Sequence, residues 1–329
     1  MVKKIATWII VPLMILIFIL DIISVAYANH LEKNYSVCAE TFDYSMGDDR
    51  IHFLNTGCSD AILIESNGKF ALIDSGEGYY NPRRKIEYTG YTKLVLDYLK
   101  KVASDENGKV QLDFILGTHC HYDHIGAFPD IIRFDNIEIT KAYLKEYNYD
   151  LVRKYESGFW DNDKTYREVL DALDDKGVPV IRDLPQTPFA FGDFIITFYN
   201  TETPKELLGN GENAASVGIK IIKGQKSVFL AADITRTCKL EQIIGPLVGD
   251  IDLLKIGHHG YYGSSSMSFL SELKPEIAIV TNHTGKIYPN VKWNLTMYSK
   301  TPVYSTVNYN GIIASFPDSG DIVLTNNIH

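Results

Sequence analysis

The sequence predicts an α/β fold in which two β-sheets pack together and are covered by helices. Short apolar runs separated by glycine-containing turns recur along the chain, as is typical of strands. Longer segments repeat apolar residues at helical spacing. The strand and helix signals alternate over most of the chain, which favours two sheets covered by helices.

The expected elements can be placed in order. The predicted strands lie at residues 51–55, 61–65, 69–74, 112–117, 179–181, 194–199, 217–222, 227–232, 251–256 and 277–281, and the predicted helices at residues 91–103, 163–176 and 234–244. Residues 217–232 form a hairpin that turns at Lys223-Gly224-Gln225. The tail, residues 303–325, alternates apolar and polar residues around two glycine-containing turns.

The N-terminal segment is distinct from the rest of the chain. Two lysines precede a nearly unbroken apolar run from Ile5 to Leu20. Lysines in this position place the N-terminus in the cytoplasm and the rest of the chain outside it. The run is long enough to cross a bilayer, whereas Ala26-Tyr27-Ala28 fits the cleavage pattern of a signal peptide. Cleavage and retention both remain open.

The N-terminal segment and the composition of the rest predict three regions along the chain. We expect residues 1–28 to be a signal peptide or transmembrane anchor, residues 29–48 a stalk, and residues 49–329 one catalytic domain. The domain would be extracytoplasmic, either secreted or anchored to the plasma membrane by residues 5–27.

Charge and cysteine content restrict the partners. The formal net charge is −9, from 32 Lys and Arg against 41 Asp and Glu, and such a field repels polyanions at long range. Nucleic acid is therefore a disfavoured partner. The four cysteines (Cys38, Cys58, Cys120 and Cys238) lie far apart, and a Cys38–Cys58 bridge in an oxidising compartment is a pairing that the sequence does not decide.

The clearest chemical signal is Thr118-His119-Cys120-His121-Tyr122-Asp123-His124-Ile125-Gly126. Imidazole and carboxylate are ligands that Zn²⁺ accepts, and a packed core does not explain four of them in so short a segment. His119 and His121, two apart on an extended loop, can face one metal. Asp123 and His124 are then turned toward a second metal. A solvated histidine-rich loop is the alternative.

Three further polar sites also follow predicted strands. Asp233 ends the strand at 227–232 and can bridge two cations, although an aspartate before a helix is more often its N-cap. His258 and His259 follow the strand at 251–256 and are flanked by glycines that permit close backbone approach. Asp74 can orient a metal-binding histidine from behind, or can simply be a turn aspartate.

Together, HxHxDH, the strand-terminal aspartate and Gly257-His258-His259-Gly260 resemble the metallo-β-lactamase superfamily, from about Ile51 to Asn327. The resemblance implies a four-layer αββα sandwich. Two branches share further motifs with this chain: competence DNA-uptake hydrolase domains and the catalytic domains of teichoic-acid phosphorylcholine esterases. These motifs are Asn55–Ile64, Leu144–Tyr147, Glu212–Val217, Gly245–Leu247 and Asp252–Lys255.

The same resemblance implies a metal site with two Zn²⁺ ions, with Mn²⁺ as an alternative. One ion would take His119, His121 and a bridging Asp233. The other would take Asp123, His124, Asp233 and His259. His258 is then left to act on the transition state, and Asp74 supports a ligand. The choice of His259 over His258 as ligand rests on the resemblance alone.

One position departs from the common pattern of this superfamily. No histidine lies between His124 and His258, where most members carry a further metal ligand, and Asn213 stands in that stretch. An amide is a poor zinc ligand, so we expect the first metal position to be open. This disfavours β-lactamase and glyoxalase II activity, and His121 in place of glutamate disfavours a flavodiiron oxidoreductase.

We therefore expect an extracytoplasmic di-zinc phosphodiesterase or phosphorylcholine esterase, in which a metal-activated hydroxide attacks phosphorus. Its partner would be a phosphate ester, with a choline-bearing envelope polymer as one candidate. Asn213, Tyr262 and Trp160 are the expected substrate contacts, because aromatic faces attract quaternary ammonium groups. The alternatives are a competence-type nuclease, which the net charge disfavours, and a non-catalytic metal-binding receptor or sensor, which the intact ligands disfavour.

Overall fold

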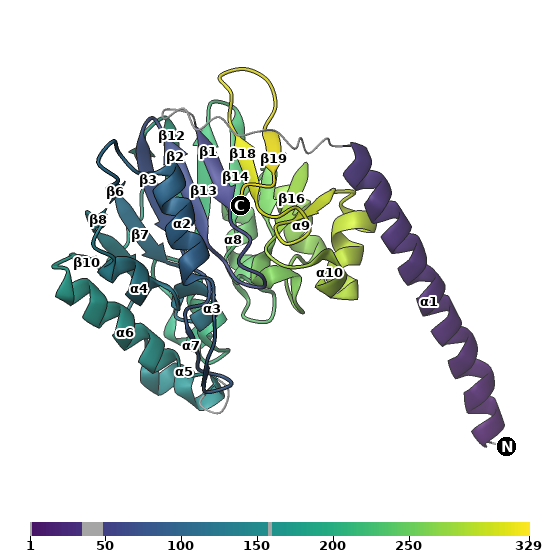
Figure 1. Cartoon of the computed structure of the whole chain (residues 1–329). Helices are drawn as coiled ribbons and strands as arrows, with labels where there is room; N and C mark the ends of the chain where they lie inside the picture. Colours follow the sequence, from purple (N-terminus) through teal and green to yellow (C-terminus); the bar gives the residue numbers. More distant parts are fainter. Residues whose placement is uncertain (1, 35–48, 157–159) are drawn as a thin grey trace.

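The computed structural model describes residues 2–34, 49–156 and 160–329. Two large sheets lie face to face, with helices on both outer faces (Figure 1). The predicted αββα sandwich is therefore confirmed. Cys38 and most of the expected stalk lie outside the described residues, so the Cys38–Cys58 pairing stays undecided.

The first sheet has eight strands in the order β10-β9-β7-β3-β2-β1-β18-β19, and the second has seven in the order β11-β12-β13-β14-β15-β16-β17. The strands of the first sheet are β1 (Arg50–Phe53), β2 (Ile62–Ser66), β3 (Lys69–Ile73), β7 (Phe114–Gly117), β9 (Ala142–Leu144), β10 (Val180–Ile181), β18 (Ile312–Ser315) and β19 (Val323–Asn326). Those of the second are β11 (Phe189–Phe191), β12 (Phe194–Tyr199), β13 (Gly218–Lys223), β14 (Lys226–Leu230), β15 (Leu253–Lys255), β16 (Ile277–Val280) and β17 (Val303–Ser305). Two small ladders pair β4 (Tyr80–Asn81) with β5 (Ile86–Glu87), and β6 (Val110–Leu112) with β8 (Ile137–Ile139).

Helices occupy the connections. The α-helices are α1 (Val2–Asn34), α2 (Thr92–Val102), α3 (Tyr122–Ile125), α4 (Phe128–Arg133), α5 (Tyr149–Glu156), α6 (Asn162–Asp175), α7 (Lys205–Leu208), α8 (Leu240–Val248), α9 (Met267–Leu273) and α10 (Pro289–Trp293). Shorter turns of helix are η1 (Glu212–Ala215), η2 (Gly257–Gly260), η3 (Thr284–Lys286) and the π-helical η4 (Asn294–Tyr298).

Side-chain alternation along the central strands explains the four layers. In β2, Ile62 and Ile64 point into the core between the sheets, whereas Leu63 points the other way, into the core shared with α2 and α4. In the second sheet, Phe229 and Leu254 pack under α8 and α9. Both faces of each sheet are thus buried, which is why these strands read as continuous apolar runs.

Two predicted elements differ substantially from the observed ones, whereas the bounds of the others agree to within two residues. The strand expected at 112–117 is divided at Asp113, because β6 pairs with β8 whereas β7 pairs with β3 and β9. The helix expected at 234–244 begins only at Leu240. The amide of Arg236 donates to the carbonyl of Gly263 (2.8 Å), and this pairing holds the preceding residues as turns. Asp233 is therefore not a helix N-cap.

Helix α1 stands apart from the sandwich. Residues Trp8–Leu31 form a helix long and apolar enough to cross a membrane, and nearly all of its large apolar side chains are exposed. Figure 1 shows it projecting from the domain, which it contacts at η4, α10 and β17. The helix continues without a break through the boundary expected at residue 28.

The topology brings the polar strand ends together. Strands β3 and β7 are parallel neighbours in the first sheet, and β14 and β15 are parallel neighbours in the second. Because the carboxyl ends of parallel strands meet at one edge, the segments that follow these four strands share one end of the sandwich.

Candidate metal centre

The HxHxDH segment changes conformation at its middle. His119, Cys120 and His121 leave β7 without regular structure, and α3 begins at Tyr122. This turn of helix packs very closely on the loop after β3: a Cβ added to Gly78 would lie 2.1 Å from the carbonyl oxygen of Gly126. Only glycine permits that approach. The contact fixes where α3 places Asp123 and His124, the residues within it that carry ligand atoms.

Asp233 lies at the centre of the site, just beyond β14. Its Oδ1 is 3.2 Å from His124 Nε2 and 3.5 Å from His259 Nε2, whereas its Oδ2 is 3.7 Å from His119 Nε2. The carboxylate therefore presents one oxygen to each of two groups of ligands. This is the geometry that a bridging role requires.

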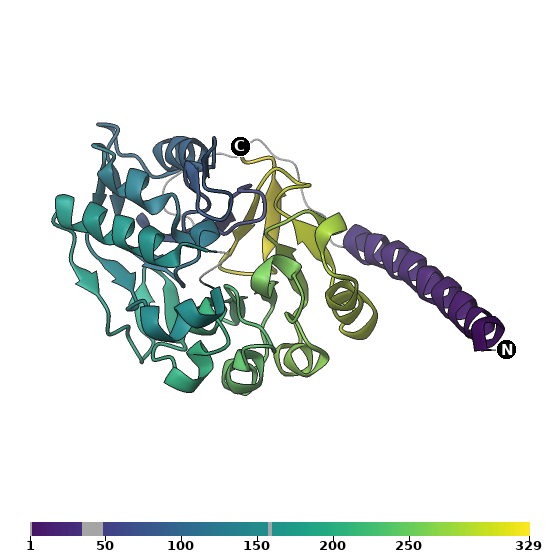
Figure 2. The same ribbon diagram turned by 90° about the horizontal axis from the view of Figure 1, so that it is seen from below.

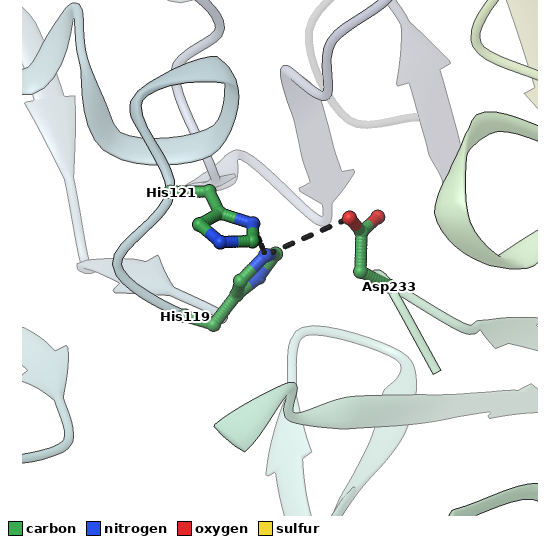
Figure 3. A group of neighbouring side chains, drawn as sticks. All are labelled: His119, His121 and Asp233. Atoms are coloured by element: carbon green, nitrogen blue, oxygen red, sulfur yellow. Dashed lines mark hydrogen bonds and ion pairs between the residues drawn. The ribbon is translucent and has the colours of Figure 1, made fainter. Parts of the chain in front are cut away.

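The first ligand group consists of His119, His121 and Asp233 (Figure 3). Figure 3 shows the two imidazoles converging, and His119 Nε2 lies 3.1 Å from His121 Nδ1. The second group consists of Asp123, His124 and His259. Here His259 Nε2 lies 3.2 Å from His124 Nε2 and 3.6 Å from Asp123 Oδ2. Within each group the ligand atoms lie within 4.8 Å of one another.

These residues fit two divalent cations. In both groups imidazole nitrogens approach each other closely in a buried setting, which a cation between them relieves. The Oδ1 atoms of Asp123 and Asp233 are buried and accept no hydrogen bond within the described part of the chain, and a buried carboxylate oxygen needs a partner. Nitrogen and carboxylate ligands suit Zn²⁺ and related transition metals.

Asp74 and Thr118 hold His124 from behind. Asp74 Oδ2 lies 2.7 Å from His124 Nδ1, and the carboxylate also accepts hydrogen bonds from the Thr118 amide (2.8 Å) and hydroxyl (2.7 Å). The contact at Nδ1 leaves His124 Nε2 directed into the site. The role expected for Asp74 agrees with this placement.

The site electrostatics follow from burial and close charges. Burial, together with the neighbouring His124, lowers the pKa of His119 well below its ordinary value, so this imidazole is neutral as a ligand must be. Burial opposes ionisation of Asp233, but His124 and His259 hold its pKa well below the usual range. The central carboxylate is therefore negatively charged.

A buried ion pair, which sequence reasoning missed, supports His259. Lys255 and Asp60 are both almost completely buried and form an ion pair. Asp60 Oδ1 also accepts from the Thr281 hydroxyl (2.6 Å) and lies 3.3 Å from His259 Nδ1. Asp60 additionally belongs to a third ligand group, with His124 and Asp233. The available signal was a lysine flanked by the apolar residues Leu253, Leu254 and Ile256 in the predicted strand.

His121 is enclosed by two residues from the region of α5. Glu156 Oε2 lies 3.3 Å from His121 Nε2, and the ring of Trp160 stacks on the imidazole at 4.9 Å between centroids. Burial lowers the pKa of His121, but Glu156 outweighs it and raises the pKa to about 9. A cation bound at His121 would therefore have to displace a proton from this imidazole. Arg83 also lies over Trp160, 5.5 Å from the ring centroid. Both His121 and Arg83 thus contact the Trp160 ring, and its expected role in substrate binding stays a prediction.

The two adjacent histidines of η2 differ in environment. Both adopt a left-handed backbone with φ of 50°. His259 is buried among the ligands, whereas the His258 side chain is 28% exposed and its Nε2 lies 3.9 Å from Asp233 Oδ2. This places His258 at the mouth of the site, beside the first ligand group, and His259 inside it.

The remaining expected substrate residues are Asn213 and Tyr262. Asn213 is in η1, next to Glu212, whose carboxylate accepts from the Cys120 amide (3.0 Å) within the histidine segment. The side-chain oxygen of Asn213 is buried and has no hydrogen-bond partner in the described chain. Tyr262 is exposed beyond η2 and contacts the Tyr288 ring at 6.1 Å.

Comparisons with known proteins agree with this geometry. The family model described as the metallo-β-lactamase superfamily matches residues 56–281. "Recombination protein 2" of Haemophilus influenzae is 25% identical over 76% of this chain, and "ComE operon protein 3" of Bacillus subtilis is 24% identical over 53%. The matches span only 26% and 20% of those relatives' lengths.

Among solved structures, the metallo-β-lactamase fold protein YhfI of Bacillus subtilis is similar, with a TM-score of 0.48 and 16% identity. The match covers 84% of this chain and 99% of that one. The family match extends over more than half of the chain and includes both ligand groups. The chain therefore belongs to the metallo-β-lactamase superfamily, whose members are generally metal-dependent hydrolases.

Proposed function

We propose that this protein is an extracytoplasmic phosphodiesterase that uses two divalent cations, Zn²⁺ or Mn²⁺, and is anchored to the membrane by α1. The observation that carries the proposal is the placement of Asp233, with one oxygen toward each ligand group. Two cations held side by side would supply Lewis-acid stabilisation of a phosphoryl group and a nucleophilic water of lowered pKa.

The residues of the chain account for the other requirements. Asp74 and Asp60 lie behind His124 and His259 and fix the direction of these ligands, so the site is preorganised. His258, at the exposed side, is placed to donate a hydrogen bond to charge that develops on the phosphoryl oxygens. Asn213 stands in the stretch of sequence where a further ligand is common, and an amide at that position would leave a coordination position for a substrate oxygen.

Among phosphodiesters, the structure weakens one expected substrate. A phosphorylcholine group needs a free aromatic face for its ammonium group. Trp160 does not offer one, because His121 and Arg83 lie against its ring. Tyr262 remains exposed, but it lines a cavity together with the cationic Arg236, which repels an ammonium group. A phosphodiester without the choline requirement is therefore the better-supported substrate class.

A nuclease is the second candidate. The similarity to Recombination protein 2 and ComE operon protein 3 favours a DNA substrate. The net charge of −9 opposes it at long range.

The test uses the full-length chain, purified in detergent, with its metal content measured. It is offered bis-p-nitrophenyl phosphate, p-nitrophenyl-phosphorylcholine and single-stranded DNA. We expect about two equivalents of metal and hydrolysis of the first substrate. Asp233→Asn should abolish that hydrolysis, and Asp193→Asn, on the distant β11–β12 turn, serves as the matched control.

Two other outcomes would favour the alternative functions. DNA cleavage that exceeds diester hydrolysis would make the nuclease the better description. Two bound metals with no turnover of any substrate would overturn the enzyme and support a metal-binding receptor or sensor.

A further inference from the structure

One surface of the second sheet's helical layer differs in charge from the rest of the protein. From Ile277 to Pro317 the chain contains no aspartate or glutamate, although its formal net charge is −9 overall. The same segment carries Lys286, Lys292 and Lys300, and none of them forms an ion pair with the residues that the structure describes. We call the surface of α10, η4 and these lysines the α10–η4 face.

Aromatic side chains accompany the lysines. Tyr288 is 43% exposed and Tyr298 is 48% exposed, and Trp293, at the end of α10, is half-buried between them. Protein surfaces at the boundary between lipid and water typically combine tryptophan and tyrosine with lysine. The aromatic rings prefer the headgroup level, and the lysines are attracted to anionic headgroups.

The α10–η4 face adjoins the candidate membrane helix. Helix α1 packs against η4 and α10, and Ser24 is buried in this contact, with its hydroxyl 3.5 Å from that of Thr296. At 1.5 Å per residue, the segment from Ile5 to Ser24 spans about 30 Å, which is the thickness of the hydrocarbon layer. A membrane span counted from Ile5 therefore ends at Ser24, where α1 meets the α10–η4 face.

We propose that the α10–η4 face rests on the anionic headgroup layer of the membrane that α1 crosses. The inference depends on the anchoring by α1 proposed above, but not on phosphodiesterase activity. Figure 2 shows α1 leaving the domain beside this part of the chain. The face also reaches the metal centre, because Tyr288 contacts Tyr261 (5.9 Å between ring centroids) and its amide donates to the Gly260 carbonyl. Docking would thus set the mouth of the site beside the membrane surface.

Lysine labelling of the full-length chain tests this orientation. The rate at which each lysine reacts with an amine-reactive ester is measured by mass spectrometry. The rates are compared between nanodiscs that contain phosphatidylglycerol, phosphatidylcholine nanodiscs and neutral detergent. We expect Lys286, Lys292 and Lys300 to react at least about threefold more slowly in the phosphatidylglycerol discs than in detergent. Lys69 begins β3 and Lys109 immediately precedes β6, two strands that lie across the domain from α10 (Figure 1), and both lysines should react equally in all three.

A charge-reversal variant makes the test specific. Lys286→Glu, Lys292→Glu and Lys300→Glu are combined, and protection of Tyr298 from hydroxyl radicals is measured. The combination should remove that protection in phosphatidylglycerol discs, whereas Lys69→Glu with Lys109→Glu should not.

Three results would overturn the proposal: equal labelling in lipid and detergent, protection that survives the triple variant, or an intact mass showing that residues 1–28 are absent from the membrane-extracted protein. Hydrolytic activity enters none of these measurements, so their outcome is independent of the proposed reaction.

Discussion

Replacing Lys255 by methionine should destabilise the protein more than any other single change of a lysine that we can identify. Lys255 is fully buried, and its ammonium group pairs with Asp60 and donates to the Ala232 carbonyl (3.1 Å). Methionine fills a similar volume, so the loss is electrostatic. It leaves the Asp60 carboxylate buried without its cation, although the hydrogen bond from Thr281 remains. Breaking one side of a buried ion pair costs about 3–5 kcal/mol of folding free energy.

A second effect should appear in metal binding. Asp60 lies against His259 Nδ1, and loss of a group that orients a ligand lowers metal affinity by about 10–100-fold. The assay is urea unfolding of the metal-free, detergent-solubilised full chain, followed by tryptophan fluorescence, together with a separate Zn²⁺ titration of the folded protein. Measuring stability without metal separates the two effects.

Lys69→Met is the matched control, because Lys69 is 52% exposed and lies 3.9 Å from Asp113. We expect its unfolding free energy to stay within about 0.5 kcal/mol of the wild type. The double variant Asp60→Asn, Lys255→Met should lose less than the two single variants added together, since no charge is left unpaired. A Lys255→Met loss below about 1 kcal/mol would refute the argument that this pair is desolvated and tightly coupled.

Three further predictions concern the metal centre. Asp233→Ala should lower bound metal to one equivalent or none by atomic emission, since one oxygen faces each ligand group; two retained metals would refute the bridging role. His259→Ala should reduce bound metal, whereas His258→Ala should retain it and lower kcat, as their burial suggests; metal loss with His258→Ala would reverse the two roles. Asn213→His should slow metal removal by a chelator and also slow phosphodiester turnover, because an imidazole can occupy the open position beside the first ligand group. Unchanged values for both would show that Asn213 is remote from the cations.

The sequence was sufficient for the features that depend on local pattern. Strand β12 was placed with the correct bounds, and the residues that follow β7, β14 and β15 meet as expected. Local pattern also explains why the strand expected at 112–117 was not divided. The run at 112–117 is apolar on both sides of Asp113, so periodicity cannot show that its two halves join different sheets.

Long-range contacts explain what was missed at the site. Glu156 lies in a polar helix and meets His121 only because α5 folds over the histidine segment. Asp60 and Lys255 are 195 positions apart, and nothing local in either segment indicates that they form a pair. Trp160 was assigned to substrate because aromatic faces attract quaternary ammonium groups, and nothing in its polar loop indicates that the ring also stacks on His121.

The ligands of each metal group come from both halves of the sandwich. His119 and His121 follow a strand of the first sheet and Asp233 follows a strand of the second; likewise, Asp123 and His124 belong to the first half and His259 to the second. Neither half alone has a complete set of ligands, so metal uptake must wait until the sheets have closed on each other. Bound metal then stabilises the contact between the two halves. At a free metal concentration one hundred times the dissociation constant, binding adds about 2.7 kcal/mol to the stability of the folded protein. In the proposed extracytoplasmic location, the protein would depend on the metal available there both for its chemistry and for keeping its two halves together.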